Sequence, residues 1–248
     1  MTNIILITNG SRPRLLEQTL RTLYENTFAD QYNLTIVGDG TSQGIEQWVM
    51  HSMEPLPDNW SPLIVFHPCN IIGRLKNLGA YWSEKQFGRG EWLCICDDDL
   101  AFTPGWLDHM IMALNTDNKL RIVGGVRHPY HKTNITKVHP FIFSDKYVQS
   151  DYDAFKDTHR DTQHTDAVAG YLHFMRWSTW GKFGPYADNQ KGLGASEDYA
   201  LCRKVVDAGG AVGYVSPACV YHTGVTNSEG KPILGAELIE KQEGILYL

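Results

Sequence analysis

The sequence predicts a single α/β domain in which helices flank a mainly parallel central sheet. Short apolar segments alternate with segments of helical period through residues 3–124, as they do in successive β-α-β units. Residues 92–96 are apolar at every position, which is typical of a strand covered on both faces of such a sheet. The length of 248 residues suits one large domain or two small ones, and we expect one.

The elements expected in the first half follow from this alternation. Strands are expected at residues 3–8, 33–37, 63–67, 92–96 and 121–124. Helices are expected between them at residues 15–24, 45–51, 73–85 and 104–114. Leucines at positions 15, 16, 20 and 23 recur with the period of a helix and mark the first of these helices.

The regular alternation stops after residue 126. Residues 127–166 are rich in His, Lys, Asp and aromatic residues without a clear period, and such a segment inside a compact domain is usually a functional loop or lid. Regularity returns with an expected strand at 167–177, a helix at 197–208, strands at 211–215 and 218–221, and a last helix at 236–242.

Composition narrows the class of protein. A net charge of −6 and a pI near 5.9 give no general attraction to nucleic acid or anionic lipid. No apolar run approaches the ~18 residues of a membrane span, and the N-terminus lacks the charged region and cleavage site of a signal peptide. The five cysteines show no paired zinc spacing, and Cys94 and Cys96 point to one face of a strand. We therefore expect reduced thiols in a cytoplasmic protein.

Three consecutive carboxylates follow the expected strand at 92–96. Asp97, Asp98 and Asp99 would lie at the carboxyl end of that strand, which is where open α/β sheets bind ligands. Adjacent carboxylates repel one another, and hard oxygen ligands suit a divalent cation such as Mg²⁺ or Mn²⁺. The alternative is an acidic turn that leads into the helix near residues 104–106, where negative charge is favourable.

Five short motifs occur in order along the chain. They are Asp39 after the second strand, Asn70, Gly73, Lys76, Asn77 and Gly79 around the third helix, the three acids, Ser-Glu-Asp-Tyr-Ala-Leu-Cys-Arg at 196–203, and Tyr-His-Thr-Gly at 221–224. This order, over residues 3–224, resembles the family-2 glycosyltransferases of the GT-A fold. The resemblance implies a single Rossmann-like domain over residues 1–248. Its nucleotide-sugar-binding half would be residues 1–100, and its acceptor-binding and catalytic half residues 101–248.

The resemblance also assigns roles to individual residues. The nucleotide sugar would be held by Thr8, Arg12, Asp39, Lys76, Asn77, Asp97 and Asp98. The metal ion, Mn²⁺ or Mg²⁺, would be held by Asp97, Asp99 and His222. Lys76 would approach the diphosphate, and Asp198 looks like the catalytic base, beside Glu197 in the same motif. The chain has Gly-Asp-Gly-Thr at 38–41 where Asp-Asp-Gly-Ser is usual in the family, which leaves the choice of nucleotide base open.

The reaction implied by this resemblance is transfer of a sugar from a nucleoside diphosphate, with UDP favoured, to an acceptor hydroxyl. A divalent cation would stabilise the charge that grows on the leaving diphosphate. Asp198 would take the proton of the attacking hydroxyl, and attack opposite to departure would invert the anomeric centre. Residues 127–186 are expected to select the acceptor. Candidate acceptors are a glycan, a lipid-linked saccharide, a polymer and DNA that bears a hydroxylated base.

Simpler explanations exist for the individual residues. Asp39 can cap the helix that follows it, and the two acids of the 196–203 motif can complement a helix dipole. His222 can be an ordinary hydrogen-bonded histidine, and the glycines of the third helix can serve packing or turns. The aromatic residues between 170 and 183 either form a platform for a sugar ring or pack in the core.

Three other functions fit parts of the sequence. Gly-Thr-Ser-Gln-Gly at 40–44 matches the nucleophile elbow of an α/β-hydrolase, with Ser42, Asp198 and His222 in the chain order of a triad. This elbow follows only the second strand, which is too early for that fold. A non-catalytic carbohydrate-binding module would need neither Asp198 nor a metal ion. A sugar nucleotidyltransferase would carry a glycine- and arginine-rich signature near the N-terminus, which this sequence lacks.

Overall fold

The computed structural model describes residues 1–9, 13–40, 45–53, 61–125, 163–168, 170–188, 197–215 and 220–222. Its first half alternates strands and helices in the order β1 (Thr2–Thr8), α1 (Pro13–Glu25), β2 (Tyr32–Asp39), α2 (Ile45–Met53), β3 (Leu63–His67), α3 (Ile72–Phe87) and β4 (Trp92–Asp97). Each range predicted for these seven elements falls inside the observed one, so the sequence prediction is confirmed for this half.

The second half has shorter elements. They are β5 (Leu100–Phe102), α4 (Trp106–Thr116), β6 (Leu120–Gly124), β7 (Gln163–Thr165), β8 (Leu172–Arg176), α6 (Trp177–Phe183), α7 (Glu197–Asp207), β9 (Ala211–Tyr214) and β10 (Val220–His222). The predictions for α4, β6, α7 and β9 are confirmed to within two residues. The predicted helix at 236–242 and most of the predicted loop at 127–166 lie outside the described residues.

Two predictions for this half are wrong. The strand expected at 167–177 is observed only as β8, because the backbone N–H of Gly170, which precedes it, donates to Asp198 and not to a neighbouring strand. The same prediction fails at its other end, where Trp177 begins α6. β7 lies at the end of the segment expected to be irregular, and β5 was not predicted, because a strand of three residues is too short to show a period.

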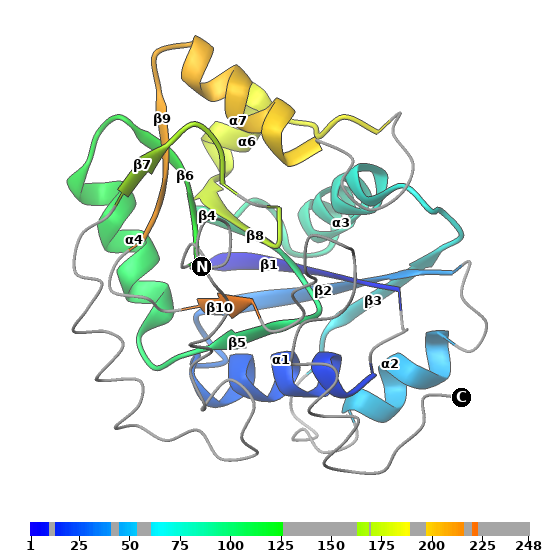
Figure 1. Ribbon diagram of the computed structural model, residues 1–248. Coiled ribbons are helices and arrows are strands. Elements are labelled where there is room, and N and C mark those ends of the chain that lie inside the picture. The colour runs from blue at the N-terminus through cyan, green and yellow to red at the C-terminus, as the bar shows by residue number, and fades with distance from the viewer. Residues whose placement is uncertain are drawn as a thin grey trace, which may run out of the picture.

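The central sheet has eight described strands, in the order β3-β2-β1-β4-β8-β6-β9-β7 (Figure 1). β1 pairs in parallel with β2 and β4, β2 with β3, and β6 with β9, whereas β8 runs antiparallel to β4 and β6, and β7 to β9. β10 and β5 form a separate antiparallel pair. The carboxyl ends of the parallel strands β1, β2 and β4 therefore meet at one edge, which is where such sheets bind ligands.

Two layers of helices cover the sheet (Figure 1). Ile4 and Leu6 of β1 face one core, to which α1, α2 and α4 contribute, and Ile5 and Ile7 face the other, to which α3, α6 and α7 contribute. This is the alternation expected of a strand with both faces covered. Gly79 of α3 lets the helix approach β1 closely, because a Cβ atom there would collide with the Ile5 side chain. The packing explanation therefore holds for this glycine.

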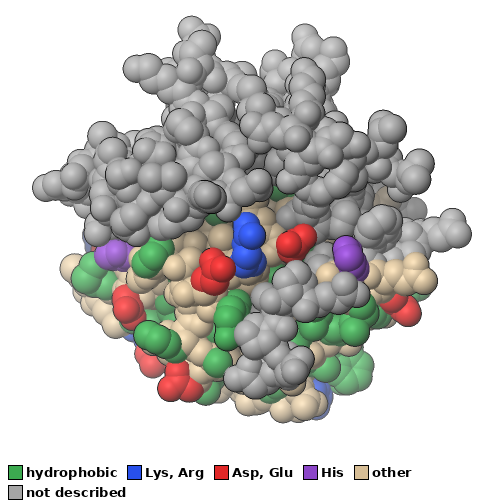
Figure 2. Space-filling model, turned by 90° about the horizontal axis from the view of Figure 1, so that it is seen from below, with side chains coloured by type: hydrophobic (Ala, Val, Ile, Leu, Met, Phe, Trp, Pro, Cys, Tyr) green, Lys and Arg blue, Asp and Glu red, His purple; other side chains and the backbone are tan. Residues whose placement is uncertain are grey.

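One face of the molecule carries described side chains of both charge signs. On the face seen in Figure 2, the described side chains include acids, bases and histidines set among apolar ones. Within the described part of the chain, no helix is both long and apolar enough to cross a membrane. Cys94 and Cys96 lie in the same core, as predicted, and these two thiols are free.

Candidate active site

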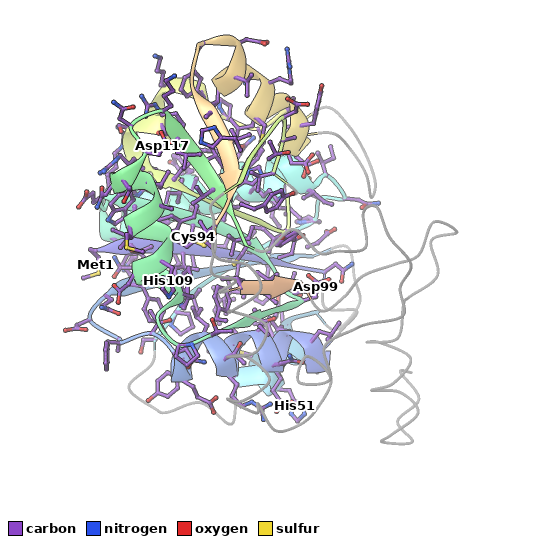
Figure 3. All side chains as sticks on the ribbon, turned by 60° about the vertical axis from the view of Figure 1, so that its left-hand side comes forward. Met1, His51, Cys94, Asp99, His109 and Asp117 are labelled. Atoms are coloured by element: carbon purple, nitrogen blue, oxygen red, sulfur yellow. The ribbon has the colours of Figure 1, made fainter. Side chains whose placement is uncertain are left out.

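The three acids lie at the edge of the sheet that the sequence predicts. β4 ends at Asp97, and the chain turns through Asp98 and Asp99 into β5. Figure 3 shows Asp99 on the side of the sheet away from Met1, close to β10. Asp97 is partly exposed, whereas Asp98 and Asp99 are each 2 % exposed. The cluster is therefore a largely buried turn at the carboxyl end of β4.

Two threonines hold this turn. The Thr8 hydroxyl, at the end of the neighbouring strand β1, donates to Asp98 Oδ2 at 2.5 Å. Thr19 Oγ1 of α1 lies 2.8 Å from the carbonyl oxygen of Asp98 and accepts the N–H of Leu100 at 2.8 Å. A charged acceptor shortens and strengthens such a bond. Thr8 and Asp98 thus bind each other, and their predicted contact with a nucleotide sugar stays a prediction.

Asp39 lies at the end of β2, at the same edge of the sheet. Its side chain is 6 % exposed, and Oδ1 accepts the backbone N–H of Cys69 at 3.1 Å. This bond joins the end of β2 to the segment between β3 and α3. The proposed contact of Asp39 with a ribose stays a prediction.

The predicted base, Asp198, begins α7 together with Glu197. Its side chain is partly exposed, and both carboxylate oxygens accept backbone N–H groups. Oδ2 accepts the N–H of Gly170 at 2.8 Å, and Oδ1 accepts the N–H of Tyr199 at 2.7 Å. Two bonds from rigid backbone fix the plane of the carboxylate, and each oxygen keeps lone-pair capacity for a further donor.

A dipeptide joins this base to the acid cluster. Gly170 binds Asp198 through its N–H, and the next residue, Tyr171, accepts the backbone N–H of Asp97 through its carbonyl at 2.9 Å. Asp97 and Asp198 are 101 positions apart in the sequence (198 − 97), yet two consecutive residues bridge them. The structure therefore brings the predicted metal-binding acids and the predicted base into one site.

A buried ion pair lies beneath the base. Lys76 of α3 places Nζ 2.9 Å from the carbonyl oxygen of Gly170 and 3.1 Å from Glu197 Oε1, with the two side chains 1 % and 7 % exposed. Burial lowers the pKa of Lys76, but the negative charges of Asp97 and Glu197 outweigh it and leave that pKa above its ordinary value. Lys76 is therefore a fixed ammonium, and its predicted approach to a diphosphate stays a prediction.

Asn77 forms a two-bond clasp with the segment after α6. Its Nδ2 donates to the carbonyl of Tyr186 at 3.0 Å, and its Oδ1 accepts the N–H of Tyr186 at 2.9 Å. The Tyr186 ring lies 5.2 Å from Lys76 Nζ, within the range of a cation–π contact. Asn77 thus places the Tyr186 ring against the buried ammonium. The predicted contact of Asn77 with the nucleotide sugar stays a prediction.

His173 and Tyr186 are buried polar residues of this site that the sequence reasoning missed. His173 Nε2 lies 3.0 Å from the carbonyl of Val168, which can only accept, so Nε2 carries the proton and Nδ1 accepts the Tyr186 hydroxyl at 2.7 Å. Burial, with a smaller contribution from Lys76, lowers the pKa of His173 to about 4, and burial raises that of Tyr186. A lone histidine within the apolar strand 172–176 was the available signal.

The donor set at this edge fits a divalent cation. In the described ranges, no three metal-ligating side chains are gathered into one group. His222 pairs with Leu100 in the β10–β5 ladder, so its backbone lies beside the residue that follows Asp99. Carboxylates such as those of Asp97 and Asp99, and the imidazole of a histidine, are types of ligand that suit Mn²⁺ or Mg²⁺. The residues present are therefore compatible with the predicted metal.

Several predicted features lie elsewhere or outside the description. Arg12 and Ser42 are outside the described residues. Tyr171 is buried in the core on the α1 side of the sheet, and Trp177 in the core on the α3 side. The partly buried side chains of Trp180 and Phe183 pack against the second core, which confirms the core explanation for these aromatic residues.

A match over most of the sequence identifies the family. Residues 3–179 match the family model described as glycosyl transferase family 2, and the chain belongs to this family. A search of curated proteins finds no match.

Solved structures share the fold at low sequence identity. The mannosyltransferase PcManGT from Pyrobaculum calidifontis, in complex with GDP-Man and Mn²⁺, has a TM-score of 0.60 and 16% identity, over 89% of this chain and 56% of that one. GalNAc-T7 with UDP, GalNAc and Mn²⁺ has a TM-score of 0.65 and 13% identity, over 93% and 45%. S. aureus TarS 1-349 has a TM-score of 0.57 and 14% identity, over 90% and 60%. The chain thus spans about half the length of these proteins, and the likeness confirms the predicted GT-A fold.

Proposed function

We propose that the protein is an inverting glycosyltransferase that moves a sugar from a nucleoside diphosphate to an acceptor hydroxyl. The observation that carries this proposal is the Gly170–Tyr171 bridge, in which Gly170 binds the Asp198 carboxylate and Tyr171 binds the backbone of Asp97, the first of the three acids. A transfer reaction of this kind needs two groups at one place: donors for a cation at the leaving diphosphate, and a base at the acceptor. Membership of glycosyl transferase family 2 supports the same reaction.

Asp198 is the proposed general base. Its two backbone hydrogen bonds hold the carboxylate in one orientation while it stays partly exposed. The acceptor hydroxyl would donate to a remaining lone pair of this carboxylate and pass its proton to it while attacking the anomeric carbon. Attack from the side opposite to the leaving diphosphate inverts that carbon.

Asp97, Asp99 and His222 are the residues that would hold the metal ion, Mn²⁺ or Mg²⁺. When bound, the ion supplies positive charge that stabilises the leaving diphosphate. PcManGT and GalNAc-T7 were both solved with Mn²⁺, which supports a divalent cation here. Asp98 would act indirectly, because its bond to Thr8 fixes the turn from which its two neighbours project.

The proposed donor side consists of Thr8, Asp39 and Asn77, at the ends of β1 and β2 and in the first half of α3, together with Arg12, which lies outside the described residues. UDP is the favoured nucleotide by resemblance to the family, although the two metal-bound neighbours hold GDP-Man in one case and UDP in the other. The proposed acceptor is a glycan, a lipid-linked saccharide, a polymer or a hydroxylated DNA base, selected by residues 127–186.

A thermal-shift screen of sugar nucleotides and nucleoside diphosphates, with and without Mn²⁺, tests this function. A ligand at 100 times its Kd stabilises the native state by about 2.7 kcal/mol, so a matching nucleotide should raise the Tm, and Mn²⁺ should increase the shift. The sugar nucleotide that raises the Tm should then be hydrolysed slowly in the presence of Mn²⁺. Binding without any turnover would favour the carbohydrate-binding alternative, and the absence of both would overturn the proposal.

A further inference from the structure

We propose that Lys76 is a positioning residue for the base: its buried ammonium fixes the Gly170 peptide, which in turn orients Asp198. This inference rests on the proposed function, because it assigns Lys76 to the base of that reaction. It differs from the role that family resemblance implies, in which Lys76 approaches the diphosphate.

The ammonium holds the base from two directions. Nζ donates to the carbonyl oxygen of Gly170, whose own N–H donates to Asp198 Oδ2. Nζ also donates to Oε1 of Glu197, the residue that precedes Asp198 at the start of α7. One cation on α3 therefore fixes both the peptide in front of the carboxylate and the helix end that carries it.

Lys76 and Asp198 are closely packed around Gly170. A Cβ atom at Gly170 would lie 3.0 Å from Lys76 Nζ, 3.0 Å from Asp198 Cβ and 3.2 Å from Asp198 Oδ2. Lys76 and Asp198 thus both lie close to the same glycine, with no room between them for a side chain, and we expect a displacement of the ammonium to shift the carboxylate. Interiors packed at this density transmit such displacements rather than absorb them.

The position of Lys76 suits this role better than contact with a substrate. An ammonium has three donors, and two are used on Gly170 and Glu197. The Tyr186 ring, 5.2 Å from Nζ, covers a further side, and the Lys76 side chain is 1 % exposed. A diphosphate would have to displace at least one of these partners to reach Nζ.

The test is Lys76→Met in the full chain, with kcat and nucleotide affinity measured separately. We expect kcat for release of nucleoside diphosphate to fall by about 100-fold, the effect of a displacement near 1 Å in a catalytic group. The Kd values of UDP and GDP, measured by calorimetry with Mn²⁺, should stay as in the wild type. A parallel loss of nucleotide affinity would overturn the inference in favour of diphosphate binding, and an unchanged kcat would also overturn it.

Two further variants protect the test against misfolding. Lys76→Met leaves a buried carboxylate unpaired, so Lys76→Met combined with Glu197→Gln removes both charges and should show the same split between kcat and Kd. Ser83→Ala is the matched control, because Ser83 is a fully buried polar residue of the same helix that accepts a hydrogen bond from Asn3, at the other end of β1. Ser83→Ala should leave kcat unchanged.

A measurement without turnover separates this inference from the proposed function. Hydrogen exchange of the Gly170 amide, followed by NMR, reports its bond to Asp198 directly. We expect this amide to exchange faster in Lys76→Met, while exchange of core amides in β1 is unchanged. If no sugar nucleotide is turned over by the wild type, the proposed function fails but faster exchange still supports the contact. Unchanged exchange refutes the positioning role, whatever the wild type catalyses.

Discussion

Replacing Asp198 with Asn removes the proposed base while keeping the size of the side chain. In the native structure, both carboxylate oxygens accept backbone N–H groups, from Gly170 and Tyr199. An asparagine can accept only one of these, and its NH₂ group must face the other N–H. The change therefore removes both the proton acceptor and one of the two bonds that orient the side chain.

The expected losses differ in size for rate and for stability. General base catalysis contributes 10²–10⁴-fold, which corresponds to about 2.7–5.4 kcal/mol in the activation free energy. An unsatisfied donor costs about 1–3 kcal/mol of folding free energy when it is buried, and Asp198 is partly exposed, so we expect the lower end of that range. The fold should survive, and the effect on kcat should dominate.

The assay compares Asp198→Asn with Asp207→Asn, which makes the same substitution at the other end of α7. Asp207 forms an exposed ion pair with Arg203 at 2.6 Å, of a kind worth about 0–1 kcal/mol. We expect Asp207→Asn to match the wild type in kcat and in nucleotide-induced Tm shift. Asp198→Asn should keep the Tm shift and lose turnover. A nearly normal kcat in Asp198→Asn would refute the assignment of the base.

The structure supports three further predictions. Lys76→Met should lower the free energy of unfolding by about 3–5 kcal/mol, because it leaves Glu197 buried without its cation, and Lys76→Met with Glu197→Gln should restore part of it in urea titrations. In the folded protein the pKa of His173 is lowered to about 4, so between pH 6.5 and 4 the unfolded state binds a proton that the folded state does not. The free energy of unfolding should therefore fall as the pH falls from about 6.5 toward 4, and His173→Gln should flatten this pH dependence. Chelation with EDTA should abolish turnover, and adding Mn²⁺ should restore turnover in the wild type but not in Asp99→Asn.

The sequence predicts most of the first half because its signals are local. Leu16, Leu20 and Leu23 repeat with the helical period and are fully buried in one core. The apolar run at 92–96 forms the strand β4, as its composition predicts. Local signals weaken in the second half. β5 and β7 have three residues each, and β8 is shorter than predicted because the Gly170 N–H donates to Asp198 and not to a neighbouring strand.

The candidate site was predictable in its charged members and not in the residues that connect them. Asp97 and Asp198 belong to motifs that can be found along the sequence. Gly170, His173 and Tyr186 belong to none, and their roles depend on contacts between elements more than ten positions apart. Lys76 was recognised from its motif, but the sequence does not reveal that its partners are Gly170 and Glu197. Such partners follow from the tertiary structure, which brings Lys76 of α3 to the start of α7.

The charges around Lys76 favour a cation at the acid end of the proposed site. Lys76 lies within Coulombic reach of Asp97, Glu197 and Asp198, so one positive charge faces three negative ones. The salt bridge takes up the charge of Glu197, and the remaining excess of negative charge would attract the proposed divalent ion to the acid end of the site. In the proposed reaction, the single charge of this buried lysine leaves the acid end of the site negative, while its hydrogen bonds to Gly170 and Glu197 set the geometry at the proposed base.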